Sequence, residues 1–383
     1  MGLAELTRNA VDVLPEGELE RKLAQGRPLR VKLGIDPTAP DIHLGNAIPL
    51  QKMAAFQREG HVGVLILGDY TARIGDPSGR SKERPVLPDE VLDANAQTFA
   101  EQAFKILDPE RTEVRYNGEW LAGLNYAEIV RITRTATVAR LLERDDFAKR
   151  FAAKAPISVS ELLYPLMQGY DSVAIQADVE LGGTEQLYNL LTGRDVMTAY
   201  GLEPQVAMTL PILVGTDGTE RMSKTRGNYV GVTDPPEEQF GKLMSIPDEV
   251  VPDYFRVSLE QEPPEAEPME AKLELARRTV ARFHGDEAAR AAEAHFTRVV
   301  REGQAPEDVP EATLPADGRV LHLPKLLVEH AGVSSTSEAR RLIGQGGVKI
   351  DGEVVHELDV PRERLEGALV QAGKRRFVRF RSA

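Results

Sequence analysis

A strand, a glycine turn and a helix follow one another within the first sixty residues, and this fragment restricts the fold more than any other. Leu29, Val31 and Leu33 alternate with polar residues as in a short strand, which Gly34 ends. Helical spacing then runs over residues 44–58. The exposed N–H groups at the start of such a helix point back at the turn and suit an anion, most often a nucleotide phosphate.

One histidine stands directly before these N–H groups. His43 would add a neutral or cationic donor aimed at the same place. A histidine that only caps the helix or packs against it is the alternative, because His-x-Gly at a helix start is a short and common pattern.

A second strand and a glycine-rich loop follow the helix. Residues 62–67 form a continuous apolar run, which fits a strand buried on both faces of a parallel sheet. The run leads into the loop 68–80, and the order strand, helix, strand, loop predicts a doubly wound α/β domain that binds ligands at the carboxyl ends of its strands. Asp76 in this loop is a candidate for binding an ammonium group, with the start of an Asp-Pro turn as the alternative.

Polar side chains recur on one face of a later helix. Tyr164, Gln168 and Asp171 stand at i, i+4 and i+7, so they share a face of an otherwise apolar helix. Core packing explains three such groups poorly, and we expect a site to face them. Residues 178–186 then form a second strand–glycine–helix junction, and the loop 217–228 is either a mobile phosphate clamp or a solvated basic loop.

The remaining chain is expected to be largely helical. Apolar spacing predicts a helical lead-in over residues 1–28 and further helices over 88–107, 126–152, 186–200, 269–284 and 286–302. The Pro- and acid-rich segments 260–270 and 303–318 are expected to be a linker and a flexible tether. In the tail, Ser335 and Glu338 predict a capping box, and residues 348–355 predict a hairpin that turns at Asp351-Gly352.

Length and composition exclude several classes of protein. A chain of 383 residues predicts two or three domains, and 42% apolar with 28% charged residues is ordinary for a soluble protein. Because no apolar run approaches 18 residues and the N-terminus carries no signal pattern, we expect a soluble intracellular protein without membrane contact. The absence of cysteine excludes disulfides and thiolate metal sites, and the seven scattered histidines give no reason to expect a structural metal.

Charge is distributed unevenly. The net charge is −13, but residues 319–383 hold 12 Lys and Arg against 8 Asp and Glu, a balance of +4, which leaves −17 for the rest. A basic tail on an acidic body suggests that the tail binds a polyanion, with a merely solvated basic face as the alternative.

Taken together and in this order, the motifs resemble a class I aminoacyl-tRNA synthetase, specifically the bacterial tyrosyl-tRNA synthetases. Residues 43–46, His-Leu-Gly-Asn, are similar to the HIGH signature, and residues 221–225, Arg-Met-Ser-Lys-Thr, to the KMSKS signature. Residues 164–171 resemble the family's Tyr-x-x-x-Gln-x-Tyr-Asp tyrosine-binding helix, and the tail resembles its S-four-like RNA-binding domain. The resemblance runs from about Gly34 to Phe380.

The resemblance implies an architecture of three parts. Residues 1–228 would form a Rossmann-like catalytic domain with a doubly wound parallel sheet. Residues 229–318 would form an α-helical anticodon-side domain and linker, and residues 319–383 a small α+β S-four-like domain.

The resemblance also implies a reaction. The family condenses L-tyrosine with ATP, which carries Mg²⁺, to tyrosyl-adenylate and pyrophosphate, and then transfers the tyrosyl group to the 3′ end of tRNA(Tyr). No protein nucleophile takes part, so catalysis consists of positioning and of stabilising charge on phosphate oxygens. Members act as cytoplasmic homodimers with tRNA across both subunits.

Residue-by-residue matching to the family then assigns roles. The expected catalytic residues are His43, Asn46, Arg221, Lys224 and Thr225. The expected ATP-binding residues are Asp36, Thr38, His43, Gly45, Asn46, Gly182, Glu185, Met222, Ser223 and Lys224, with Glu180 near the ribose. The expected tyrosine-binding residues are Gly34, Asp76, Tyr164, Gln168, Asp171 and Gln186. Apart from this matching, Arg340, Arg341, Lys349, Arg375 and Arg376 in the basic tail are our candidates for binding tRNA through its phosphates.

Four positions depart from the family pattern. Asn46 replaces the second histidine of HIGH, Arg221 the first lysine of KMSKS, and Glu185 a more usual aspartate. Lys32 stands where many bacterial members place a tyrosine that contacts the substrate hydroxyl, so that recognition of the hydroxyl would depend mainly on Asp171. A subgroup with Lys-Leu-Gly at this place is familiar, and we interpret the change as a subtype.

Two other functions compete with this interpretation. Another class I adenylate-forming ligase, such as a tryptophanyl enzyme, is disfavoured by the helix 164–171 and by the basic tail. A non-catalytic RNA-binding relative is disfavoured because an inert core would need none of His43, Lys224, Asp76 and Gln168.

Overall fold

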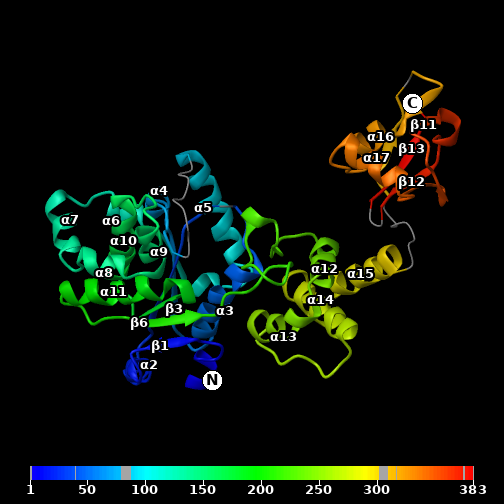
Figure 1. Ribbon diagram of the computed structural model, residues 1–383. Coiled ribbons are helices and arrows are strands. Elements are labelled where there is room, and N and C mark those ends of the chain that lie inside the picture. The colour runs from blue at the N-terminus through cyan, green and yellow to red at the C-terminus, as the bar shows by residue number, and fades with distance from the viewer. Residues whose placement is uncertain are drawn as a thin grey trace. The chain divides into compact units, whose positions relative to one another are not determined.

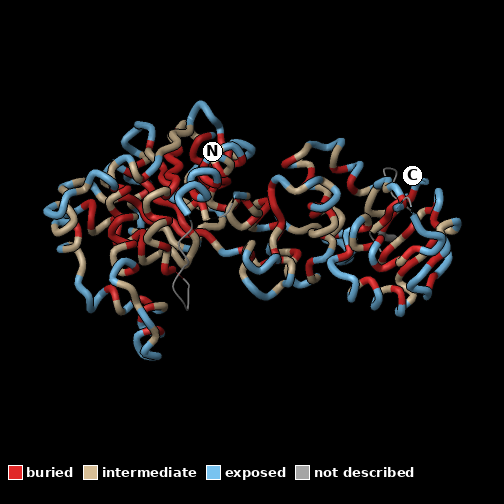
Figure 2. Tube along the Cα trace, turned by 90° about the horizontal axis from the view of Figure 1, so that it is seen from above, coloured by how far each residue is buried: buried red, intermediate tan, exposed pale blue. Residues whose placement is uncertain are grey.

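The computed structural model divides the chain into two compact units. They comprise Met1–Phe283 and His284–Ala383, and each has a buried interior of its own (Figures 1 and 2). The residues that the structure describes are 2–38, 40–78, 88–301, 309–315, 317–373 and 376–382.

The first unit is built on a six-stranded sheet in the order β1-β6-β5-β2-β3-β4. Its strands are β1 (Asp12–Leu14), β2 (Arg30–Ile35), β3 (Val62–Leu67), β4 (Thr112–Tyr116), β5 (Val179–Gly183) and β6 (Val206–Leu210). All neighbouring strands are parallel except β1, which runs antiparallel to β6. The chain moves from β2 outward to β3 and β4, and later returns to β5 on the other side of β2, which confirms the doubly wound sheet.

Helices cover both faces of this sheet. The main ones are α3 (Leu44–Arg58), α5 (Asp89–Ala103), α10 (Val159–Ile175) and α11 (Leu187–Ala199). Because right-handed crossovers that run in opposite directions place their helices on opposite faces, α3 and α5 lie on one face and α10 and α11 on the other (Figure 1). Two glycines let α10 and α11 approach closely, since a Cβ atom on Gly169 would lie 3.1 Å from the Cα atom of Gly193.

The expected helical lead-in is wrong in its middle. Residues 3–6 and 18–23 are helical as α1 (Leu3–Leu6) and α2 (Glu18–Leu23), but β1 lies between them. Val13 pairs with Met208 of β6 and thereby satisfies backbone groups at the open edge of the sheet. Three residues are too few to show a strand period, so the partner strand decides their conformation.

The expected helix over 126–152 is divided into α7 (Tyr126–Thr133), α8 (Val138–Leu142) and α9 (Asp145–Ala152). Side-chain caps from Asn125 and Thr137 begin the first two of these helices. Shorter elements complete the unit: α4 (Thr71–Ile74), η1 (Pro109–Arg111), α6 (Gly118–Leu121), η2 (Thr184–Gln186), η3 (Lys224–Arg226), α12 (Pro236–Met244), η4 (Asp248–Val250), α13 (Val251–Asp253), η5 (Tyr254–Ser258) and α14 (Pro268–His284).

The second unit begins with α15 (Asp286–Phe296) and η6 (Thr297–Arg301), and continues as a small α+β fold. Its other elements are β7 (Glu311–Thr313), β8 (Val320–His322), α16 (Leu323–His330), α17 (Thr336–Gly344), β9 (Val348–Ile350), β10 (Glu353–Val354), β11 (Asp359–Pro361), η7 (Arg362–Arg364), β12 (Leu369–Ala372) and β13 (Arg376–Arg381). One core, which includes Leu327, Ile343 and Phe380, joins the helices to the five-stranded sheet β10-β9-β12-β13-β7.

Of three predictions for this unit, the hairpin is confirmed, whereas the capping box and the tether differ from the structure in part. The hairpin β9–β10 is confirmed, with Asp351 and Gly352 in left-handed conformation at its turn. Ser335 caps α17 as predicted, but the carboxylate of Glu338 accepts from the N–H of Ser334 at 3.0 Å, which is one residue before the position that a capping box requires. The tether expected over 303–318 lies partly outside the described residues, and residues 311–313 form β7, parallel to β13.

Among the described residues, no helix is both long and apolar enough to span a bilayer.

Candidate active site

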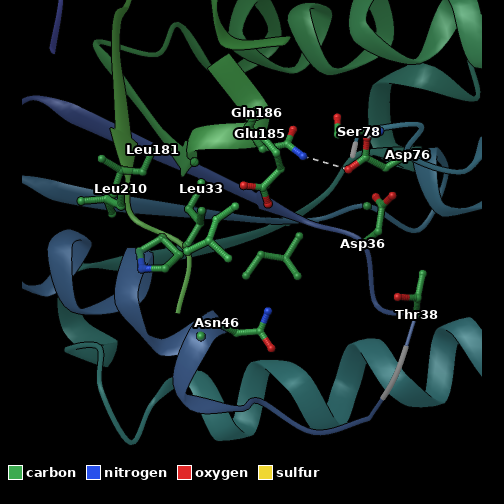
Figure 3. A pocket seen from close by; sticks show the side chains of 18 of the residues that line it. Leu33, Asp36, Thr38, Asn46, Asp76, Ser78, Leu181, Glu185, Gln186 and Leu210 are labelled. Carbon is green, nitrogen blue, oxygen red and sulfur yellow. Dashed lines mark hydrogen bonds between the residues drawn. The ribbon is translucent and has the colours of Figure 1, made fainter. Parts of the chain in front are cut away.

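A cavity of about 550 Å³ opens at the carboxyl ends of the parallel strands. Gly34 at the end of β2, Gly68 after β3, Gly182 in β5 and Leu210 at the end of β6 all line it. This is where doubly wound sheets place ligands. Apart from Glu180, every residue that the sequence assigned to catalysis, ATP or tyrosine lines this same cavity, although the roles themselves stay predictions. Figure 3 labels several of them, among them Asp36, Asn46 and Asp76.

His43 and Asn46 hold each other at the start of α3. The Nδ1 atom of His43 accepts from the N–H of Asn46 at 3.2 Å, and the Oδ1 atom of Asn46 accepts from the N–H of His43 at 3.3 Å. Nδ1 therefore carries no proton, and burial, with help from the nearby Lys224 charge, lowers the pKa of His43 to about 4. The neutral ring thus keeps its proton on Nε2. His43 is a helix cap, and its second nitrogen is still a donor.

The loop 217–228 reaches this turn through its lysine. Lys224 donates from Nζ to the backbone oxygen of Asp41, two residues before His43. Burial lowers the pKa of Lys224 to about 8, and the nearby Asp41 carboxylate opposes that shift. Arg226, in contrast, is exposed and pairs with Glu220 at 2.8 Å. The alternative of a solvated basic loop therefore fits Arg226 but does not fit Lys224, which is half-buried.

The opposite end of the cavity is rich in amides and carboxylates. Gln186 donates from Nε2 to Oδ2 of Asp76 at 2.9 Å, drawn as the dashed line in Figure 3. The other oxygen of Asp76 accepts from the N–H of Ser78 at 2.9 Å, so Asp76 both begins a turn and faces the cavity. Tyr164 donates from its hydroxyl to Asp36 at 3.0 Å.

Asp171 lies at the inner end of this polar cluster, almost fully buried. It accepts from Nε1 of Trp120 at 2.8 Å and from Nδ2 of Asn117 at 3.3 Å. Burial raises the pKa of Asp171 to about 7, while the charge of Lys32 and these two donors oppose the shift. Sequence reasoning missed Asn117 and Trp120. Both follow the carboxyl end of β4, where ligand-binding residues of such sheets lie. That position, together with the fact that Trp120 is the chain's single tryptophan, was the sequence signal that could have identified them.

Lys32 is fully buried and lies behind the cavity wall. Its Nζ atom contacts Oε1 of Glu180 at 2.8 Å, the backbone oxygen of Gln168 at 2.8 Å and Oγ of Ser172 at 2.7 Å. The lysine therefore joins β2 to β5 and to α10. The expectation that Glu180 borders the ribose is wrong, because its side chain is fully buried and bonded to Lys32, Gln168 and Gln205.

Glu185, another departure from the family pattern, does face the cavity (Figure 3). Burial raises the pKa of its carboxyl group, and the charge of Arg221 opposes that shift. Among the residues that the structure describes, those of the cavity included, no three His, Asp or Glu side chains are grouped so that they could hold a metal ion.

The residues expected to bind tRNA lie in the second unit. Arg340 and Arg341 are exposed on α17, and Lys349 is half-buried in β9. Arg376 donates from Nη1 to Glu338 at 3.0 Å. Arg375 lies outside the described residues.

Comparison with known protein families gives two matches. Residues 24–301 match the family described as tRNA synthetases class I (W and Y), which is more than half of the chain. Residues 323–358 match the S4 domain.

Individual proteins agree with the family match. The chain is 50% identical to the tyrosine–tRNA ligase of Moorella thermoacetica over 391 residues, which cover 98% of this chain and 94% of that protein. It is 50% identical to the tyrosine–tRNA ligase of Thermotoga maritima over 387 residues, which cover 98% and 96%. Among solved structures, tyrosyl-tRNA synthetase of Archaeoglobus fulgidus complexed with L-tyrosine has a similar fold, with a TM-score of 0.62, 24% identity, and coverage of 76% of this chain and 98% of that chain.

The sequence resemblance is thus confirmed over nearly the full length, and so are the parallel sheet and the C-terminal S4 domain that it implied. The chain belongs to the class I tRNA synthetases, within the family of the bacterial tyrosine–tRNA ligases.

Proposed function

We propose that this protein is a tyrosine–tRNA ligase, which activates L-tyrosine with ATP and transfers it to the 3′ end of tRNA(Tyr). The observation that carries the proposal is the single cavity in which both signature motifs and the polar cluster of α10 meet. One end offers donors for phosphate, and the other offers carboxylates and amides for an amino acid.

At the phosphate end, catalysis would consist of positioning and charge stabilisation. The Nε2–H group of His43 and the amide NH₂ of Asn46 would donate to the α-phosphate as the tyrosine carboxylate attacks it. Both are fixed by the reciprocal cap at the start of α3, so little reorganisation is needed. Lys224 would follow the leaving pyrophosphate, together with Arg221. The nucleotide would enter as its Mg²⁺ complex.

At the amino-acid end, two carboxylates would divide the recognition of tyrosine. Asp76 would bind the ammonium group, and Asp171 would accept a hydrogen bond from the phenol. Trp120 and Asn117 hold the Asp171 carboxylate in place at the inner end of the cluster. With Lys32 behind the cavity wall, Asp171 would be the main group that separates tyrosine from phenylalanine.

The second unit would bring tRNA to this site. Its S4 domain and the exposed Arg340 and Arg341 on α17 support phosphate contacts. We further propose a cytoplasmic homodimer. Sedimentation of the purified protein would test the homodimer.

Tyrosine-dependent ATP–pyrophosphate exchange tests the activation step. Phenylalanine and tryptophan would be assayed alongside tyrosine, with the variants Lys224→Ala and, as a matched control, Lys325→Ala, whose side chain is exposed on α16. We expect exchange with tyrosine only, lost in Lys224→Ala and retained in Lys325→Ala. Exchange with tryptophan would indicate the tryptophanyl enzyme, and no exchange with any of the three would favour a non-catalytic RNA-binding protein.

A further inference from the structure

Asn189, a fully buried residue of α11, connects two amides of the cavity. Its Nδ2 atom lies 3.0 Å from Oε1 of Gln168 and 2.9 Å from Oε1 of Gln186. It also lies 3.2 Å from Oγ of Ser78. Asn189 itself was not among the residues predicted from the sequence, and it does not line the cavity.

Arg144 determines which way the Asn189 amide faces. Its Nη1 atom lies 2.8 Å from Oδ1 of Asn189, and a guanidinium group can only donate. The atom of Asn189 that faces Arg144 is therefore the oxygen, and the NH₂ group faces the two glutamines. Arg144 is held in turn by Asp146, at 2.6 Å and 2.9 Å, and both side chains are buried.

This polarity is passed on to both glutamines. Because the NH₂ group of Asn189 donates, Gln168 and Gln186 present their oxygens to it, and their NH₂ groups point the other way. At those far ends stand two carboxylates, Glu180 at 3.0 Å from Gln168 and Asp76 at 2.9 Å from Gln186. Ionised carboxylates only accept, so every contact in the chain pairs a donor with an acceptor.

The opposite orientation has no such consistency. If Asn189 turned its oxygen toward the glutamines, the oxygen of each glutamine would have to face either the oxygen of Asn189 or a carboxylate oxygen. A buried contact between two acceptors is costly. We propose that Asn189 and Arg144 are positioning residues for amino-acid recognition, which fix the amide orientation of Gln168 and Gln186. This inference rests on the proposed function, since its readout is the binding of tyrosine.

Asn189→Asp tests the proposal with almost no change in shape. The new carboxylate keeps the contact with Arg144 but cannot donate to either glutamine. We expect KM for tyrosine in pyrophosphate exchange to rise about ten-fold or more, the equivalent of one lost hydrogen bond to a charged group, with KM for ATP within about two-fold. Equilibrium dialysis with labelled tyrosine should show the same loss of affinity.

A second pair of variants keeps the test decisive if Asn189→Asp fails to fold. Arg144→Lys retains a donor-only group and should keep most tyrosine affinity, whereas Arg144→Met removes the donor and should lower it. The matched control is Gln57→Glu, a buried amide that donates to the backbone oxygens of Asp108 and Arg111, none of which lines the cavity. It should lower thermal stability without selectively raising KM for tyrosine.

Two results would overturn the inference. A folded Asn189→Asp protein with an unchanged KM for tyrosine would show that the amide orientations do not depend on Asn189. Equal loss in Arg144→Lys and Arg144→Met, with KM for ATP raised as much as KM for tyrosine, would show a purely structural role. Failure of the parent enzyme to exchange with tyrosine would instead refute the proposed function.

Discussion

Replacing Lys32 by methionine should destabilise the first unit strongly, because it leaves Glu180 buried without its counter-charge. The two side chains are 0% and 1% exposed, and Nζ lies 2.8 Å from Oε1. At that distance and an effective dielectric constant of about 20, two unit charges attract by about 6 kcal/mol. Part of this is offset because methionine avoids the desolvation of an ammonium group. Removing one partner of a buried pair typically costs about 3–5 kcal/mol, and we expect Lys32→Met to lower the unfolding free energy by that amount.

The measurement is urea and thermal unfolding of the parent and the variant at pH 7. For a unit of this size the expected loss corresponds to a melting temperature lower by about 6–10 °C. The matched control is Lys242→Met, since Lys242 lies at the same 2.8 Å from Asp234 but is 27% exposed. There the loss should be about 1 kcal/mol or less.

A double variant separates the buried charge from other effects of the substitution. Lys32→Met combined with Glu180→Gln carries neither charge, so it should be more stable than Lys32→Met alone. The reasoning is refuted if Lys32→Met stays within about 1 kcal/mol of the parent, or if the double variant is no more stable than the single one.

Three further outcomes follow from other parts of the molecule. Burial raises the pKa of Asp171 from 3.8 to about 7, so the stability that its protonated form contributes is lost as the pH rises through that window. Asp171→Asn should therefore gain unfolding free energy relative to the parent between these pH values, and a difference independent of pH would contradict the raised pKa. Replacing Arg340 and Arg341 by alanine should raise KM for tRNA. It should also lower the slope of log KM against log salt concentration by about 0.7–0.9 for each lost phosphate contact, which charging assays at several salt concentrations would measure. Deleting the chain from Gly318 onward should spare pyrophosphate exchange but abolish most tRNA charging, and equal loss of both activities would count against separate roles.

Much of the fold was predictable because its signals are local. The apolar run 62–67 predicts a strand and the apolar spacing over 44–58 predicts a helix, and neither prediction depends on the rest of the chain. Both are confirmed, as β3 and α3. β1 was not predictable in this way. Its residues 12–14 are extended because they pair with β6. The paired residues Asp12 and Thr209 are 197 positions apart in the sequence.

In the candidate site, too, residues with a local sequence signal were predictable and residues placed by distant parts of the chain were not. Residues within signature motifs could be assigned by type and order, and the structure brings them to one cavity. Asn117 and Trp120 belong to no such motif, and they meet Asp171 only because β4 ends beside α10. Glu180 was misplaced because its position next to the glycine junction gives no information on which way a strand side chain points.

Lys32 shows why a departure from a family motif cannot be interpreted alone. By its position it suggested a change in the contact with the tyrosine hydroxyl, whereas its ammonium group lies behind the cavity wall and compensates Glu180. Glu180 in turn accepts from Gln168, whose other end accepts from Asn189. A substitution at residue 32 would therefore alter tyrosine binding through the orientation of an amide, even though Lys32 itself does not line the cavity. The same reasoning predicts that Lys32 and Asn189 variants are not additive in their effect on KM for tyrosine, because both act on the single side chain of Gln168.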